Sequence, residues 1–93
     1  SEKYISLSAL DLYKKILIAL NNKEISNQQQ LKLFLDKEGF NNSSRDASRT
    51  SKKLSEDLKW IKRERVLING RWTNKLSLTK KGQIWLTSKN ILY

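Results

Sequence analysis

The stretch VLINGRWTNKLSLTKKGQIWL, residues 66–86, decides how this chain folds. Its first part carries strand-forming residues on both sides of Asn69 and Gly70. An Asn-Gly pair between two such runs predicts a β-hairpin, because both central residues of a type I′ turn need positive φ angles. After Thr79 the apolar residues return to helical spacing, and the threonine hydroxyl is suited to cap a last helix.

The Asn-Gly turn also sets the expected register of the hairpin. With a two-residue turn, Ile68 stands opposite Arg71 and Leu67 stands opposite Trp72. A longer hairpin that turns near Asn74-Lys75 is the competing register. The two registers differ in which side chains stand opposite one another across the strands.

Three helices are expected before the hairpin, because apolar residues recur there every three or four positions. The first covers residues 8–20, and the second begins after Ser26, a suitable cap, and continues until Gly39. The third covers residues 44–62. Its inward-facing residues form a narrow stripe: Ala47, Ser51, Leu54, Leu58 and Ile61.

Length and charge indicate a single folded domain over residues 1–93 that associates with a polyanion. The chain has 19 Lys and Arg against 9 Asp and Glu, so its formal net charge is +10. This excess favours nucleic acid as the partner over an anionic membrane. No stretch approaches the roughly 20 apolar residues that a membrane helix needs, and we therefore expect no membrane association and a cytoplasmic location.

Cysteine and histidine are both absent. Without them, the usual zinc sites and the Ser-His and Cys-His nucleophile pairs cannot be built. The acidic residues nearest to forming pairs fall on predicted helix surfaces, and no glycine-rich phosphate loop accompanies them: Asp11, Asp36, Glu38, Glu56 and Asp57. We therefore expect no catalytic activity, no metal site and no cofactor.

The closing stretch LSLTKKGQIWL, residues 76–86, resembles the strand-to-helix segment of MarR and PadR-like regulators. In those proteins a strand of the wing ends in Leu-Thr, and a charged pair and a glycine lead into the last helix. The predicted order of helix, helix, turn, helix, hairpin and helix resembles the winged helix-turn-helix fold over essentially the whole chain. This resemblance implies a mainly α fold with a small β-hairpin as the wing, and a third helix that enters the major groove of DNA.

The resemblance makes the exposed face of the third helix the expected base-reading surface. Arginine can bind guanine through two hydrogen bonds, and serine and lysine also reach base edges. A merely solvated face is the alternative, in which Asp46 pairs with a basic residue one turn away. The candidate base-reading residues are Arg45, Ser48, Arg49 and Lys52.

Other polar residues are expected to hold the phosphate backbone or to reach the minor groove. The candidates for the DNA backbone are Asn27, Gln28, Ser43, Ser44, Thr50 and Lys53. Simple helix capping is the alternative role for the residues that open the second helix. On the wing, Arg71 and Lys75 are expected to contact DNA, whereas all three tryptophans, Trp60, Trp72 and Trp85, are expected to serve packing.

We expect the protein to be a homodimer. The first helix is apolar over a wide arc, so one of its faces is expected to pack against another copy of the chain. A helix wholly enclosed in the core is the alternative. The expected dimer interface contains Leu12, Ile16, Trp85, Ile91 and Leu92.

These expectations describe a homodimer that binds double-stranded DNA sequence-specifically and regulates transcription from a palindromic operator. The alternative is a centromere-binding protein of a plasmid partition system, which spreads along DNA and has another partition or regulatory protein as its partner. The compact, lysine- and asparagine-rich chain is similar to small winged-helix proteins of archaeal plasmids and viruses. A third hypothesis is a winged helix that binds only protein, and a steep salt dependence would distinguish DNA binding from it.

Overall fold

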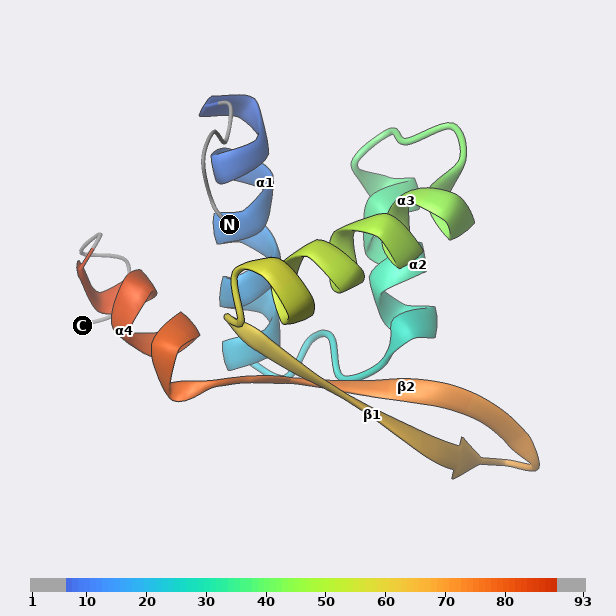
Figure 1. Ribbon diagram of the computed structural model, residues 1–93. Helices are drawn as coiled ribbons and strands as arrows, with labels where there is room; N and C mark the ends of the chain where they lie inside the picture. Colours follow the sequence, from blue (N-terminus) through green and yellow to red (C-terminus); the bar gives the residue numbers. More distant parts are fainter. Residues whose placement is uncertain (1–6, 89–93) are drawn as a thin grey trace.

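The computed structural model describes residues 7–88 (Figure 1). This part of the chain is mostly helical, with four α-helices, one short π-helical turn and a two-stranded antiparallel hairpin. The elements in chain order are α1 (Leu7–Asn21), α2 (Gln28–Lys37), α3 (Ser43–Lys52), η1 (Lys53–Asp57), β1 (Ile61–Ile68), β2 (Arg71–Leu78) and α4 (Lys80–Ser88). The expected class, mainly helical with a small hairpin, is confirmed.

The hairpin turns at Asn69 and Gly70, as the sequence predicts. Their φ angles are 51° and 74°, the left-handed values that a type I′ turn requires. Both predicted partner pairs are present, Ile68 with Arg71 and Leu67 with Trp72. The competing turn near Asn74-Lys75 is wrong, because both residues lie inside β2 and are paired with β1.

The third helix ends earlier than expected. After α3 the chain makes a π-helical turn, in which the N–H of Leu58 donates to the carbonyl of Lys53, and Lys59 then adopts a left-handed φ of 58°. Ile61 and Lys62 therefore begin β1 and do not continue the helix. Ile61 is buried as well, but as a strand residue. Its burial and its distance of three residues from Leu58 imitate a continuation of the helical stripe.

Asparagine side chains begin the two helices that follow α1. Asn27 Oδ1 accepts a hydrogen bond from the N–H of Gln30 at 2.9 Å, so Asn27 caps α2 in place of the expected Ser26. The Gln30 side chain in turn accepts a hydrogen bond from the N–H of Ser26, the residue before the cap. Asn42 Oδ1 similarly accepts from the N–H of Arg45 at the start of α3.

The core is built around α1, which stands between α4 on one side and the α2–α3 pair on the other (Figure 1). Its buried apolar residues are Tyr13, Ile16, Leu17, Ala19, Leu20, Ile25, Leu31, Leu35, Ala47, Leu54, Leu58, Trp60, Ile61, Leu76 and Leu86. All five residues of the predicted inward stripe are buried, Ser51 included. Helical spacing accounts for Ala47, Ser51 and Leu54, whereas Leu58 and Ile61 lie beyond the helical segment. Ile16 is completely buried by its own chain, so its expected role at a dimer interface is wrong.

An aromatic cluster joins α1 to α4. The rings of Trp60 and Trp85 stack with their centroids 4.2 Å apart, and the ring of Tyr13 meets Trp60 edge-on at 6.4 Å. Burial raises the pKa of the Tyr13 hydroxyl, and the nearby positive charge of Lys53 opposes this shift. Trp60 and Trp85 thus pack as expected.

The Leu-Thr-Lys-Lys-Gly motif at the end of β2 has a structural role. Thr79 Oγ1 accepts a hydrogen bond from the N–H of Gly82 and donates one to the carbonyl of Lys59, at 3.1 Å and 2.7 Å. The Thr79 N–H donates to the carbonyl of Trp60 at 3.0 Å. A Cβ atom on Gly82 would clash with that same carbonyl, so the close approach of α4 requires glycine here.

We expect Gly82→Ala to destabilise the protein by about 1–3 kcal/mol in urea unfolding, because the added methyl group must push α4 away from Trp60. The sign is diagnostic, since alanine in a helix without this clash stabilises by about 1 kcal/mol. Gln83→Ala, at an exposed position in the same helix, is the control and should not lower the unfolding midpoint. A Gly82→Ala variant as stable as the native protein would contradict the clash.

Candidate nucleic-acid interface

The four candidate base-reading residues occupy one exposed face of α3 and its continuation. Arg45, Ser48, Arg49 and Lys52 are all exposed, whereas the opposite face of the helix is buried in the core. The structure therefore brings these residues together as the helical spacing predicts. A helix that buries one face so completely presents the other as a rigid surface.

Two of the cations on this face have no acidic partner in the part of the chain that the structure describes. Within residues 7–88, neither Arg49 nor Lys52 lies within ion-pair distance of a carboxylate. Asp46 lies 3.8 Å from the guanidinium of Arg45, its neighbour in the chain, and pairs with no residue one turn away. Arg49 therefore takes part in no i,i+4 ion pair with the described residues, and the alternative of a face covered by such pairs does not hold at this position.

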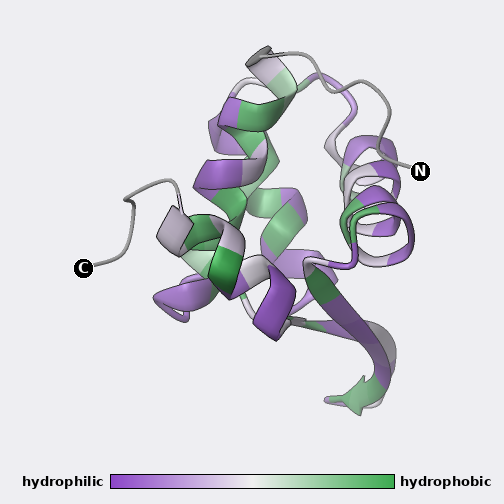
Figure 2. Cartoon of the chain, turned by 60° about the vertical axis from the view of Figure 1, so that its left-hand side comes forward, coloured by the Kyte–Doolittle hydropathy of each residue, from purple (hydrophilic) through white to green (hydrophobic). Residues whose placement is uncertain are grey.

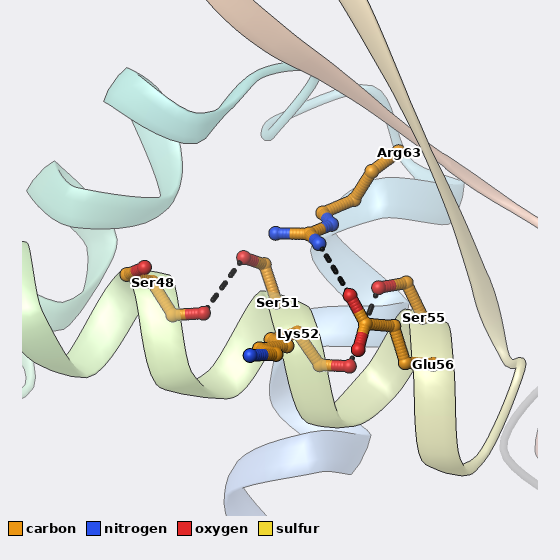
Figure 3. A network of polar contacts seen from close by, with 6 residues as sticks. All are labelled: Ser48, Ser51, Lys52, Ser55, Glu56 and Arg63. Carbon is orange, nitrogen blue, oxygen red and sulfur yellow. Dashed lines mark hydrogen bonds and ion pairs between the residues drawn. The ribbon is translucent and has the colours of Figure 1, made fainter.

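A polar network at the end of α3 fixes the hairpin to the helix (Figure 3). Arg63 reaches from β1 to Glu56 in η1, with 2.9 Å between its guanidinium nitrogen and the carboxylate oxygen. Ser51 and Ser55 donate to the carbonyls of residues 48 and 52, so their hydroxyls serve the helix itself. Sequence reasoning missed the Arg63–Glu56 ion pair, which compensates the charge of Arg63 and links β1 to η1.

The candidates for the DNA backbone are distributed unevenly. Ser44 is exposed at the start of α3, and Thr50 is half-buried. Ser43 is buried, so the expectation that its hydroxyl binds phosphate is wrong. Lys53 is half-buried, and its ammonium lies 3.4 Å from the carboxylate of Asp57, so much of its charge is already compensated.

The start of α2 lies beside β2. The N–H of Leu76 donates to the carbonyl of Ser26 at 2.9 Å, and Asn27 forms an isolated antiparallel bridge with Lys75. Asn27 acts as the cap of α2, which confirms the capping alternative for this residue. The cap uses only the side-chain oxygen, so the cap leaves the two amide N–H donors of Asn27 unused. Gln28 is half-buried, and its Oε1 atom is buried without a hydrogen-bond partner.

Two shallow hollows connect these elements. One, of about 370 Å³, lies between the start of α2 and the end of the hairpin and is lined by Asn27, Gln29, Ile68, Asn69, Arg71 and Thr73. The other, of about 300 Å³, is lined by Gln28, Gln29, Lys32, Ser44, Ala47 and Thr73. Because Gln29 and Thr73 line both hollows, a polar depression runs from the first turn of α3 to Arg71.

The exposure of Trp72 shows that the role in packing expected for this residue is wrong. Its side chain is 58% exposed near the end of the hairpin, beside Leu67, which is 56% exposed. The guanidinium of Arg65 lies over the indole, 5.6 Å from the ring centroid. The outer half of the hairpin extends beyond the helices (Figure 1), so the described part of the chain leaves this face of the strands exposed.

The expected dimer residues lie on different parts of the surface. Leu12 is half-buried, and Trp85 is half-buried with one ring face against Trp60. Ile91 and Leu92 lie outside the described residues. The most exposed large apolar residue of α4 is Ile84, at 59%, which sequence reasoning did not single out for this role.

The described residues contain neither a metal-binding cluster nor a membrane helix. Among residues 7–88, no group of three or more acidic side chains lies close enough to hold a metal ion. No helix in the same range has the length and apolar character needed to cross a bilayer. The candidate site in this part of the chain is the polar and basic surface of α3, α2 and the hairpin.

We expect Trp72 to supply most of the fluorescence that acrylamide can quench, because Trp60 is buried and Trp85 is stacked on it. The Trp72→Phe variant should show a blue-shifted emission spectrum and a clearly smaller quenching constant than the native protein. Trp85→Phe is the control and should leave the accessible fraction of the emission unchanged. Equal quenching of the native protein and Trp72→Phe would show that Trp72 is covered.

No protein-family model, no curated protein and no solved structure matches this chain.

Proposed function

We propose that this protein is a winged helix-turn-helix protein that binds double-stranded DNA sequence-specifically as a homodimer and regulates transcription. In this proposal α2 and α3 form the helix-turn-helix, the β1–β2 hairpin is the wing, and α3 is the recognition helix. The observation that carries it is the exposed face of α3, where Arg49 and Lys52 have no acidic partner among the described residues. An unpaired arginine on a rigid helix is suited to bind guanine in the major groove.

The rest of the surface supports the same partner. The polar depression between α2, α3 and the wing offers amide and hydroxyl groups, and Arg71 stands at its outer end. Such groups bind phosphate oxygens and fix the orientation of a protein on the duplex. Charge supports the proposal as well, since the chain carries a formal net charge of +10.

A dimer through α4 would complete the proposed function. Ile84 is exposed, and Trp85 beside it is only half-buried, so α4 offers an apolar face to a second copy. A palindromic operator with half-sites one turn apart would require two recognition helices about 34–36 Å apart, related by a two-fold axis. Binding of two half-sites at once would raise both affinity and specificity.

The DNA-binding proposal is tested by selecting duplexes from a random pool and measuring their affinity by fluorescence anisotropy. We expect Arg49→Lys to lower the ratio of selected to random binding by about 5- to 150-fold, because lysine keeps the charge but loses the bidentate contact. Binding to random DNA should change little. For the native protein, affinity should fall steeply between about 50 mM and 200 mM salt.

The matched control is Lys80→Ala, which removes a cation from α4 on the far side of the molecule from the start of α3 (Figure 1). It should leave the selected-to-random ratio unchanged. A native protein that binds no duplex at low salt, or that binds selected and random duplexes equally, would contradict the proposal.

The dimer is tested by analytical ultracentrifugation of Ile84→Glu. We expect this variant to sediment as a folded monomer where the native protein sediments as a dimer, because the buried charge would lack a partner. Gln83→Glu, which adds the same charge at the next exposed position, should remain dimeric. Dimers of Ile84→Glu as stable as those of the native protein would exclude α4 as the interface.

A further inference from the structure

The end of the wing carries an apolar surface that the rest of residues 7–88 leaves uncovered. Leu67 and Trp72 stand directly opposite each other in the antiparallel register, so their side chains share one face of the hairpin. Each is more than half exposed, and Ile68 beside them is 40% exposed. Figure 2 shows the end of β1, which carries Leu67 and Ile68, in green and well away from the helices.

The apolar pair and Arg71 lie on opposite faces of the wing. Side chains alternate along a strand, so Ile68, Arg71 and Thr73 share the face that lines the hollow beside α2. Leu67 and Trp72 therefore point away from that hollow. A groove that received the wing would meet cationic and polar groups on one side and an apolar pair on the other.

The charges around the pair favour a polyanion as the partner. Arg65 and Arg71 are the charged residues nearest the turn, and the acidic residue of the hairpin, Glu64, stands opposite Lys75. Neither Arg65 nor Arg71 has an acidic partner within residues 7–88. Apolar side chains flanked by cations are complementary to a DNA duplex. The apolar side chains can contact the stacked bases, and the cations can contact the phosphates of the two backbones.

The wing is also rigid enough to act as a wedge. A type I′ turn closes it, eight residues of each strand are paired, and the guanidinium of Arg65 covers one face of the Trp72 indole. The Arg63–Glu56 ion pair holds its base against the helix that would lie in the major groove. A short rigid element of this kind reaches the minor groove next to that helix.

We propose that Leu67 and Trp72 form a wedge that enters the minor groove, partly unstacks one base step and bends the duplex. This inference rests on the proposed DNA binding. Apolar wedges of this kind bend DNA by about 20–90° toward the major groove. Flexible pyrimidine–purine steps are the easiest to open, so the wedge selects TA or CA/TG steps at a position where the protein makes no base-specific hydrogen bond.

The test uses the full chain and a selected duplex of about 30 base pairs, with fluorescent dyes at its two ends to report bending by energy transfer. The native protein should bring the dyes closer together. Leu67→Ala combined with Trp72→Ala should still bind, because α3 is unchanged, but about 5- to 100-fold more weakly and without bending. Leu33→Ala removes an exposed leucine from α2 and should bend the duplex as the native protein does.

The outcomes separate the wedge from the proposed function. If the native protein binds and bends the duplex and the double variant binds without bending, the wedge is supported. Equal bending by both proteins, or binding by the native protein without bending, overturns the wedge and leaves DNA binding intact. Absence of duplex binding by the native protein overturns both the wedge and the proposed function. A blue shift of Trp72 emission with anionic phosphatidylglycerol vesicles, but not with the duplex, would also overturn the wedge and would assign the end of the hairpin to membranes.

Discussion

The rest of the structure depends on two hydrogen bonds that Thr79, at the end of β2, donates to the carbonyl groups of Lys59 and Trp60. These bonds, from the Thr79 hydroxyl and N–H, join the chain entering the hairpin to the chain leaving it. The same threonine caps α4, and Gly82 lets that helix lie against the Trp60 carbonyl. One junction therefore sets the base of the hairpin, the start of the last helix and the position of the Trp60–Trp85 stack.

This junction explains why the two halves of the hairpin differ. Near the base, Ile61 and Leu76 are buried against the helices, and Arg63 is paired with Glu56. Beyond that point the strands leave the core, and Leu67 and Trp72 are exposed. The inner half thus serves stability, and the outer half is available to a partner.

Ion pairs divide the surface in a similar way. Lys15 on α1 lies near both Asp11 and Glu38, and its pKa is raised chiefly by the hydrogen bond with Glu38. By contrast, Arg49 and Arg71 have no carboxylate partner among the described residues. Exposed pairs contribute little to stability, so their main effect is on where positive charge stays available to a ligand.

The sequence by itself determined the features that depend on a few neighbouring residues. The Asn69-Gly70 turn, the Thr79 cap and the buried stripe through Ala47 and Leu54 follow from local φ angles, hydrogen bonds and helical periodicity, and all are confirmed. The exposed face of α3 follows from the same periodicity, because a helix that buries one stripe must present the opposite one.

Only the tertiary structure decided what depends on coverage by a distant element. Ile16 is enclosed because α1 is surrounded by its own chain, whereas Trp72 is exposed because the helices end before the hairpin does. Ser43 is buried for the same kind of reason, since residue type and spacing do not tell which parts of the fold will cover a side chain. The ion pair of Lys53 with Asp57 is different, because the two residues lie four positions apart in the same helical stretch. Burial is a property of the assembled fold, and periodicity specifies only which residues share a face.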